Sequence, residues 1–155
     1  MQCQPAAGSL DLKAGQLIDR VGGMLGLPFP AGPALEALAA SAKERYAPRP
    51  SMEGADCHLS GVENQCRSLH DKGMPPEEVA AFCLASVLAA VDAMTAALQR
   101  QYGPLPVVYA GGVMANRQLR DQLTARHGGC FAPPAFSADN AAGIAVLAAR
   151  RYTDR

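Results

Sequence analysis

The stretch GGVMAN, Gly111 to Asn116, follows the apolar run from Leu105 to Ala110 and opens the amphipathic stretch from Met114 to His127. This order predicts a strand, a glycine turn and the start of a helix. Adjacent glycines let the backbone approach a ligand without a Cβ in the way, and the unpaired amides of the following turn point toward that ligand. Nucleotides are the usual ligands. An ordinary strand-to-helix turn that needs positive φ would explain the two glycines equally well.

A second candidate segment lies near the N-terminus, in LKAGQLIDRVGGMLGLPFPAGP. Its apolar residues recur at helical spacing, which predicts a helix that ends near Gly26. Gly15 and Asp19 lie off the apolar stripe, so we expect the Asp19 carboxylate to lean over the bare backbone at Gly15. A flat ligand could lie on the glycine, with ribose hydroxyls against the carboxylate. The alternative is a solvated Asp19 and a glycine that merely weakens the helix.

A third candidate segment is FAPPAFSADNAAGIA, near the C-terminus. Cys130 to Ala132 read as a short strand that the following prolines end. Ser137 is the expected N-cap of a final helix, with Asp139 and Asn140 in its first turn. A carboxylate there is favoured by the helix dipole and can face a cleft, although capping alone would also explain it.

Several motifs occur in a fixed order along the chain: AGQLIDRVGGMLGLPFPAGP, HLSGVEN, VVYAGGVMANRQLR, FAPP and SADNAAGIA. Together they resemble the C-terminal half of the tRNA threonylcarbamoyladenosine-modifying threonylcarbamoyltransferases, a family once classed as glycoproteases or M22 peptidases. The resemblance extends from Leu10 to about Ala149. It implies one half of the actin, Hsp70 and sugar-kinase (ASKHA) fold, in which two related α/β halves close on a nucleotide.

The resemblance implies a site for ATP or threonylcarbamoyl-adenylate. The family's nucleotide contacts fall on Gly15 and Asp19, and on the turn of Gly111 and Gly112 together with Asn116. The position of the family's metal-binding aspartate is Asp139. In the family this aspartate binds iron or zinc together with two histidines of an HxxxH motif on the N-terminal half.

We expect no metal bound to this chain alone. The sequence does not contain the HxxxH half, and His58, His70 and His127 do not have its spacing. One carboxylate without partner ligands does not hold a transition metal tightly. The sequence also departs from the family at two places. Glu63 stands where a lysine commonly follows the SGL turn, and residues 137–143 differ from the usual Cys-Thr-Asp-Asn-Gly-Ala-Met, as in a shorter bacterial branch.

Length and composition favour one folded domain. The chain has 155 residues, 49% of them hydrophobic, which is enough for a core and disfavours disorder. We expect a helix-rich α/β domain with a depleted sheet, because Met1 to Gly8 is too short for the strands that begin such a half. Residues 1–9 are expected to be flexible and 47–59 to form a surface loop. Helices are expected from Pro33 and from Pro75, the latter as the central core helix.

The charge balance gives no general attraction to nucleic acid, because 14 basic and 14 acidic residues cancel. We therefore expect tRNA to bind only in a full assembly with the missing N-terminal half or a homologous subunit. Basic clusters at Lys43, Arg45 and Arg49 and at Arg117 and Arg120 are explained by solvated surfaces.

Cysteine usage favours a cytoplasmic protein, since the five cysteines form no CxxC pair and no zinc spacing. The N-terminus is not a signal peptide. The most apolar stretch, Val79 to Leu98, contains Asp92 and keeps a helical stripe, which favours a soluble helix over a membrane span.

Three functions remain open from the sequence. The first is the nucleotide-binding half of a threonylcarbamoyltransferase-like protein, inactive alone and with no catalytic residue identified. The second is a non-catalytic interaction module of the same family that pairs with a related subunit or forms a homodimer. The third is part of a small-molecule kinase of the same superfold. The old peptidase classification has no support, because neither HExxH nor a Ser, His and Asp arrangement stands out.

Overall fold

A computed structural model describes residues 4–137 and 141–153 of the chain. Its centre is α4 (Pro76–Tyr102), the long core helix that the sequence predicts. Proline at the first helical position and two glutamates in the first turn favour its start, and Gly103, with φ of 84°, ends it. Its length and composition would also suit a membrane span, but half of its most apolar 18-residue window is buried inside the structure. The burial identifies it as a core helix.

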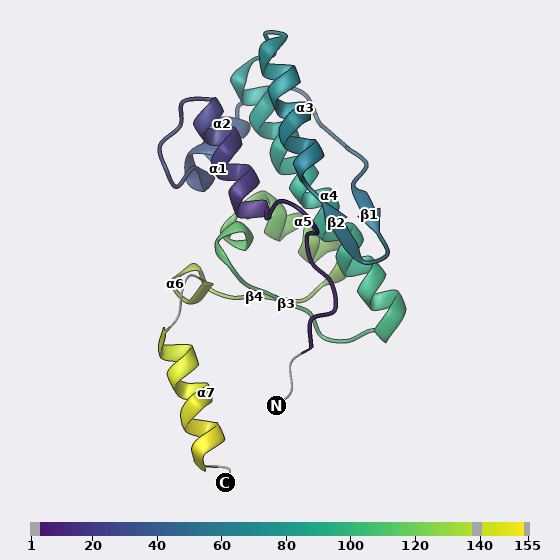
Figure 1. Cartoon of the computed structure of the whole chain (residues 1–155), viewed down its shortest axis with the longest axis vertical. Helices are drawn as coiled ribbons and strands as arrows, with labels where there is room; N and C mark the ends of the chain where they lie inside the picture. The colour runs from purple at the N-terminus through teal and green to yellow at the C-terminus, as the bar shows by residue number, and fades with distance from the viewer. Residues whose placement is uncertain (1–3, 138–140, 154–155) are drawn as a thin grey trace.

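Three helices pack around α4 and one another (Figure 1). They are α1 (Ala14–Met24), α2 (Gly32–Ala39) and α3 (Ser60–Asp71). The first two lie within a few residues of their expected positions, whereas α3 was not predicted. The core between these helices consists of fully buried side chains, including Leu17, Val21, Leu35, Cys66, Val79, Cys83 and Val87.

Gly22 allows α1 and the start of α2 to approach closely. A Cβ at this position would lie 2.2 Å from the Cβ of Ala31, which no side chain permits. The glycine therefore has a packing role that its sequence context does not reveal.

A β-hairpin occupies most of the range 47–59, which was expected to be a surface loop. Strands β1 (Ser51–Glu53) and β2 (Asp56–His58) pair antiparallel. Cys57 is only 2% exposed, so the hairpin covers part of the core. The Cys57 amide donates to the Gly8 carbonyl at 3.0 Å, which ties the end of the N-terminal segment to the hairpin. The strands were missed because each has only three residues, too few for a periodicity to show.

The second sheet has two parallel strands, β3 (Val108–Tyr109) and β4 (Cys130–Phe131). The fold is thus helix-rich α/β with small sheets, as expected. Between the strands lie the 3₁₀ turn η1 (Gly112–Ala115) and α5 (Arg117–His127). The helix expected from Met114 begins at Arg117, because Asn116 caps it.

The C-terminal segment contains the short helix α6 (Pro134–Ser137) and then α7 (Ala141–Thr153). Ser137, the expected N-cap of the final helix, lies at the end of α6, and its hydroxyl donates to the Ala132 carbonyl at 3.1 Å. Asp139 and Asn140, expected in the first turn of that helix, lie outside the described residues. In Figure 1, α7 lies apart from the body of the molecule. Ile144, Val146 and Leu147 on α7 are largely exposed.

Glu78 fastens the segment before the hairpin to α4. One of its carboxylate oxygens accepts the Lys43 amide at 2.8 Å, and the other accepts the Tyr46 hydroxyl at 2.9 Å. The Lys43 hydrogen bond is the main cause that lowers the pKa of Glu78, while desolvation and the bond to Glu78 raise the pKa of Tyr46 to about 12.

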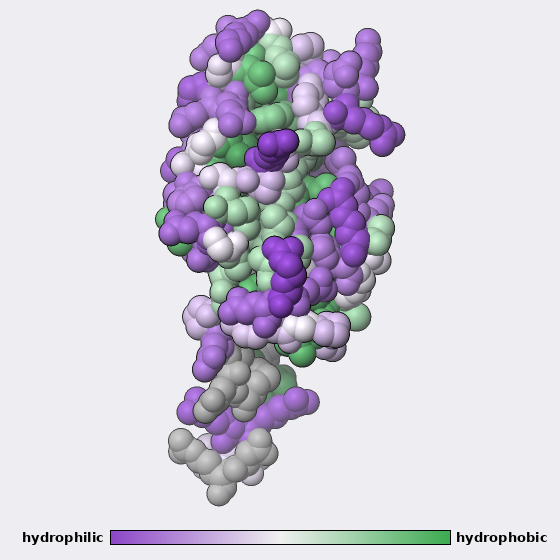
Figure 2. Space-filling view, turned by 90° about the vertical axis from the view of Figure 1, so that its right-hand side faces the viewer, coloured by the Kyte–Doolittle hydropathy of each residue, from purple (hydrophilic) through white to green (hydrophobic). Residues whose placement is uncertain are grey.

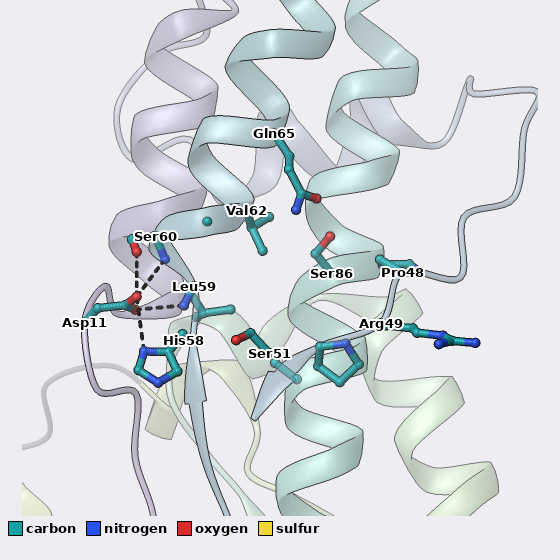
Figure 3. A pocket seen from close by; sticks show the side chains of 13 residues that line it. Asp11, Pro48, Arg49, Ser51, His58, Leu59, Ser60, Val62, Gln65 and Ser86 are labelled. Atoms are coloured by element: carbon teal, nitrogen blue, oxygen red, sulfur yellow. Dashed lines mark hydrogen bonds and ion pairs between the residues drawn. The ribbon is translucent and has the colours of Figure 1, made fainter. Parts of the chain in front are cut away.

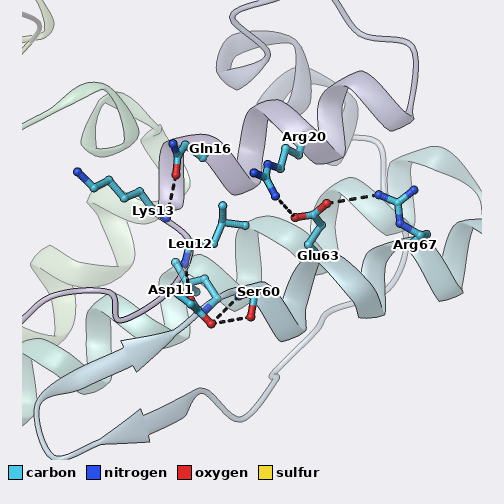
Figure 4. A network of polar contacts seen from close by, with 9 residues as sticks. Asp11, Leu12, Lys13, Gln16, Arg20, Ser60, Glu63 and Arg67 are labelled. Carbon is cyan, nitrogen blue, oxygen red and sulfur yellow. Dashed lines mark hydrogen bonds and ion pairs between the residues drawn. The ribbon is translucent and has the colours of Figure 1, made fainter.

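Asp11 caps α3 from a distant part of the chain (Figure 4). Its carboxylate accepts the Leu59 amide at 2.7 Å, the Ser60 amide at 3.2 Å and the Ser60 hydroxyl at 2.6 Å. Desolvation raises the pKa of Asp11, but these hydrogen bonds outweigh it and hold the pKa well below its usual range.

We expect Asp11→Ala to lower the free energy of unfolding by roughly 1–2 kcal/mol at pH 7, as for other helix N-caps. Asp11→Asn keeps an acceptor without the charge. Because the folded pKa is depressed, the charge stabilises fully above the unfolded value of about 4 and less as the pH falls below it. Urea unfolding should therefore show a gap between wild type and Asp11→Asn that narrows from pH 5 to pH 3. A gap that is constant or widens over this range would contradict the assignment.

Candidate functional site

The glycine turn presents unpaired backbone donors. Gly111 has φ of 105°, which favours glycine. Within the described part of the chain, the amides of Gly111, Gly112 and Val113 make no hydrogen bond, whereas the Met114 amide donates to the Gly111 carbonyl at 3.0 Å. A Cβ at either glycine would meet no atom within 4 Å. A side chain at either glycine would therefore meet no neighbouring atom among the described residues.

The other two segments singled out from the sequence both reach this turn. Helices α1 and α6 both contact η1. A Cβ at Gly15 would lie 3.8 Å from a Val113 methyl group, an ordinary van der Waals distance. Gly15 and the glycine turn are thus neighbours. Helix α6, which precedes Asp139 in the chain, also contacts this turn, but Asp139 itself lies outside the described residues.

Asp19 has a partner that the sequence did not predict. Its carboxylate accepts the Ala31 amide at 2.9 Å and so fixes the start of α2. This places Asp19 in a structural contact rather than leaving it solvated. Its second oxygen makes no hydrogen bond to any described residue.

Asn116 is 7% exposed and acts as the N-cap of α5. Its side-chain oxygen accepts the Leu119 amide at 3.0 Å. Beside it, the carboxylate of Glu36 accepts the Arg117 amide at 2.9 Å. The Asn116 oxygen therefore points into the helix start, and Glu36, which the sequence did not single out, completes the cap.

The residues in the described ranges 4–137 and 141–153 do not fit a metal ion. They contain no group of three or more His, Cys, Asp or Glu side chains that could hold one. His127 instead contacts Asp92 at 2.6 Å, and His58 lies 3.6 Å from both Asp11 and Glu53.

An aromatic stack supports the sheet behind the turn. Tyr109 and Phe131 stack with ring centroids 4.5 Å apart, and the Arg120 guanidinium lies 5.5 Å from the Phe131 centroid. The Arg120 Nε is buried and has no hydrogen-bond partner among the residues that the structure describes. Arg120 therefore packs on the sheet and is not simply part of a solvated face, in contrast to the exposed Arg117.

A cavity of about 300 Å³ lies between the hairpin, α3 and α4 (Figure 3). Gln65 and Ser86 point into it. Asp11 lies at its edge, where its carboxylate already accepts hydrogen bonds from the start of α3. A wider groove of about 960 Å³ runs along α4 and includes Glu36 and Arg117 on its border. Figure 2 shows a band of hydrophobic residues between hydrophilic flanks along one side of the molecule. None of the described residues that were predicted to bind nucleotide lines either of these two hollows.

The family model for tRNA N6-adenosine threonylcarbamoyltransferase (TsaD) matches residues 1–146. The chain belongs to the TsaD family. The enzyme of this name from Thermus thermophilus is 34% identical over 148 residues, which cover 92% of this chain and 45% of the relative. That from Gluconobacter oxydans is 37% identical over 165 residues, covering 93% and 45%. The chain thus spans less than half the length of the curated relatives it matches.

Glu63, the departure from the family's lysine, joins α1 to α3 (Figure 4). Its carboxylate lies 2.9 Å from Arg20 on α1 and 3.3 Å from Arg67 on α3. The reversed charge is therefore compensated by two arginines. Because both arginine side chains are more than half exposed, each pair contributes little individually.

Restoring the family residue with Glu63→Lys should lower the free energy of unfolding by roughly 1 kcal/mol, since it removes two partly exposed ion pairs and gathers three cations. The double variant Arg20→Glu with Glu63→Lys should regain part of this loss. Denaturant unfolding of the wild type, the single variants and the double variant measures the coupling. Strictly additive effects would show that the pair is not formed.

Proposed function

We propose that this chain is the nucleotide-binding half of a tRNA threonylcarbamoyladenosine transferase and is inactive alone. The observation that supports this most directly is the run of three amides, Gly111 to Val113, that have no partner among the described residues and lie near Gly15. Free N–H groups suit the acceptor atoms of a ligand. The ligand is ATP or threonylcarbamoyl-adenylate, with its adenosine part at the turn.

In the whole protein, the reaction is transfer of a threonylcarbamoyl group to N6 of a tRNA adenosine. The N6 amine attacks the carbamoyl carbonyl carbon, the bond from that carbon to the adenylate phosphate oxygen breaks, and AMP leaves with the electron pair. The amine proton passes to a base. The described residues offer no identifiable general base, so this half contributes binding and orientation of the adenylate.

The site depends on Gly15 having no side chain. Gly15→Val fills the space beside Val113 and should weaken ATP and adenosine binding by at least about tenfold. Gly23→Val is the matched control: it lies on the same helix, and a Cβ there meets nothing within 4 Å. Isothermal titration calorimetry on the two variants and the wild type measures the effect. Equal affinities for the two variants, or absence of binding by the wild type, would refute the proposed site.

A second candidate function, the non-catalytic interaction module, is supported by α7. Ile144 is 69% and Leu147 48% exposed, three residues apart on one helix face. If this face joins two copies of the chain, the wild type is a dimer and the double variant Ile144→Glu with Leu147→Glu is a monomer. Light scattering after size exclusion distinguishes the two. A monomeric wild type would leave the nucleotide-binding half as the better proposal.

A further inference from the structure

The cavity of about 300 Å³ between the hairpin, α3 and α4 combines an apolar wall with polar side chains from two helices (Figure 3). Its volume lies at the lower end of the range for small-molecule sites, which have mostly apolar walls and a few convergent polar groups. The wall includes Pro50, Leu59, Val62 and Ala90. The glycine turn contributes none of the lining residues, so this cavity is distinct from the proposed nucleotide site.

Ser86 on α4 offers the cavity a hydrogen-bond acceptor. The residue is only 4% exposed, and its side chain points into the cavity. Its hydroxyl donates to the Phe82 carbonyl, one helical turn earlier, at 2.8 Å. Because a hydroxyl has one hydrogen and two lone pairs, the oxygen can still accept but has no second hydrogen to donate. A ligand that contacts Ser86 in this arrangement must therefore present an N–H or O–H group.

Gln65 on α3 points into the same cavity with its amide group unpaired. Neither the oxygen nor the nitrogen of its side chain makes a hydrogen bond to any residue that the structure describes. The side-chain amide has one acceptor oxygen and two donor N–H groups. The complementary group is another amide, which can form two parallel hydrogen bonds with it. Because Gln65 is exposed, these bonds replace bonds to water and each contributes only a modest net stabilisation.

The charged residues at this cavity have other partners or point elsewhere. Asp11 accepts the Ser60 amide and hydroxyl at the start of α3. His58 lies 3.6 Å from both Asp11 and Glu53. The side chain of Arg49 extends away from the cavity in Figure 3. An ion inside the cavity would lose hydration without gaining a charged partner, so these surroundings favour an uncharged ligand.

We propose that this cavity binds a small, uncharged molecule with a primary amide group. The ligand carbonyl accepts an N–H of Gln65, and one ligand N–H donates to the Gln65 oxygen. The second ligand N–H donates to the Ser86 oxygen, and the apolar remainder of the molecule packs on the wall formed by Pro50, Leu59, Val62 and Ala90. This binding site goes beyond the proposed function and does not depend on it.

The test titrates the full 155-residue chain with three probes that have equal numbers of non-hydrogen atoms. Butyramide carries the primary amide, methyl propionate keeps a carbonyl without any N–H, and butyrate carries a negative charge. Nuclear magnetic resonance follows the side-chain amide of Gln65 and the backbone amides around Gln65 and Ser86. Butyramide should shift these resonances to saturation and bind about tenfold or more tightly than either other probe, because it alone donates to Ser86.

Gln65→Ala and Ser86→Ala remove the two polar contacts separately, so the result does not depend on the folding of one variant. Each should weaken butyramide binding at least about fivefold. Asn64→Ala is the matched control, because it removes a neighbouring exposed amide side chain of α3 that does not line the cavity, and it should bind as the wild type does. Absence of saturable binding, equal or tighter binding of methyl propionate or butyrate, or an equal loss in Asn64→Ala would overturn the proposal.

Discussion

Carboxylates that accept backbone N–H groups from other segments fix the positions of the helices of this chain relative to one another. Asp11 caps α3, Asp19 fixes the start of α2, Glu36 closes α5 and Glu78 fastens the segment at Lys43. The described residues contain only two small sheets, so few ladder hydrogen bonds connect their elements. Apolar packing is non-directional, so it brings helices together without setting their offset. A charged acceptor on an unpaired amide supplies the direction and is stronger than a neutral hydrogen bond.

This use of acidic side chains changes how a ligand can be recognised. Asp19 and Asn116 are predicted from the sequence to bind a nucleotide. In the structure, each uses one side-chain oxygen to accept a backbone N–H at the start of a helix. Among the described residues, the donors left without a partner are the backbone amides of Gly111 to Val113. The proposed binding at the turn would therefore depend on chain geometry, namely the positive φ of Gly111 and the close approach of Gly15, more than on any single functional group.

The features that the sequence predicted are the local ones. Helical periodicity located α1, α2 and α4, and the paired glycines located the turn, because each signal lies within a few neighbouring residues. The hairpin and α3 were missed, the first because its strands are three residues long. The contact between Glu36 and Arg117 could not be predicted for a different reason, because no periodic pattern connects residues 81 positions apart. The same holds for Asp19 and Ala31, whose bond gives a predicted ligand residue a structural role.

A site made of backbone amides, as proposed for the turn, would also tolerate the two departures from the TsaD family. Glu63 lies between α1 and α3. Its negative charge is compensated by the ion pairs with Arg20 and Arg67. Substitutions in residues 137–143 alter side chains, whereas the turn amides remain whichever side chains follow. A metal-dependent step, by contrast, requires specific side chains in a fixed geometry. Under the proposed function, nucleotide binding is therefore the property that this half would retain by itself, and catalysis would need the rest of the protein.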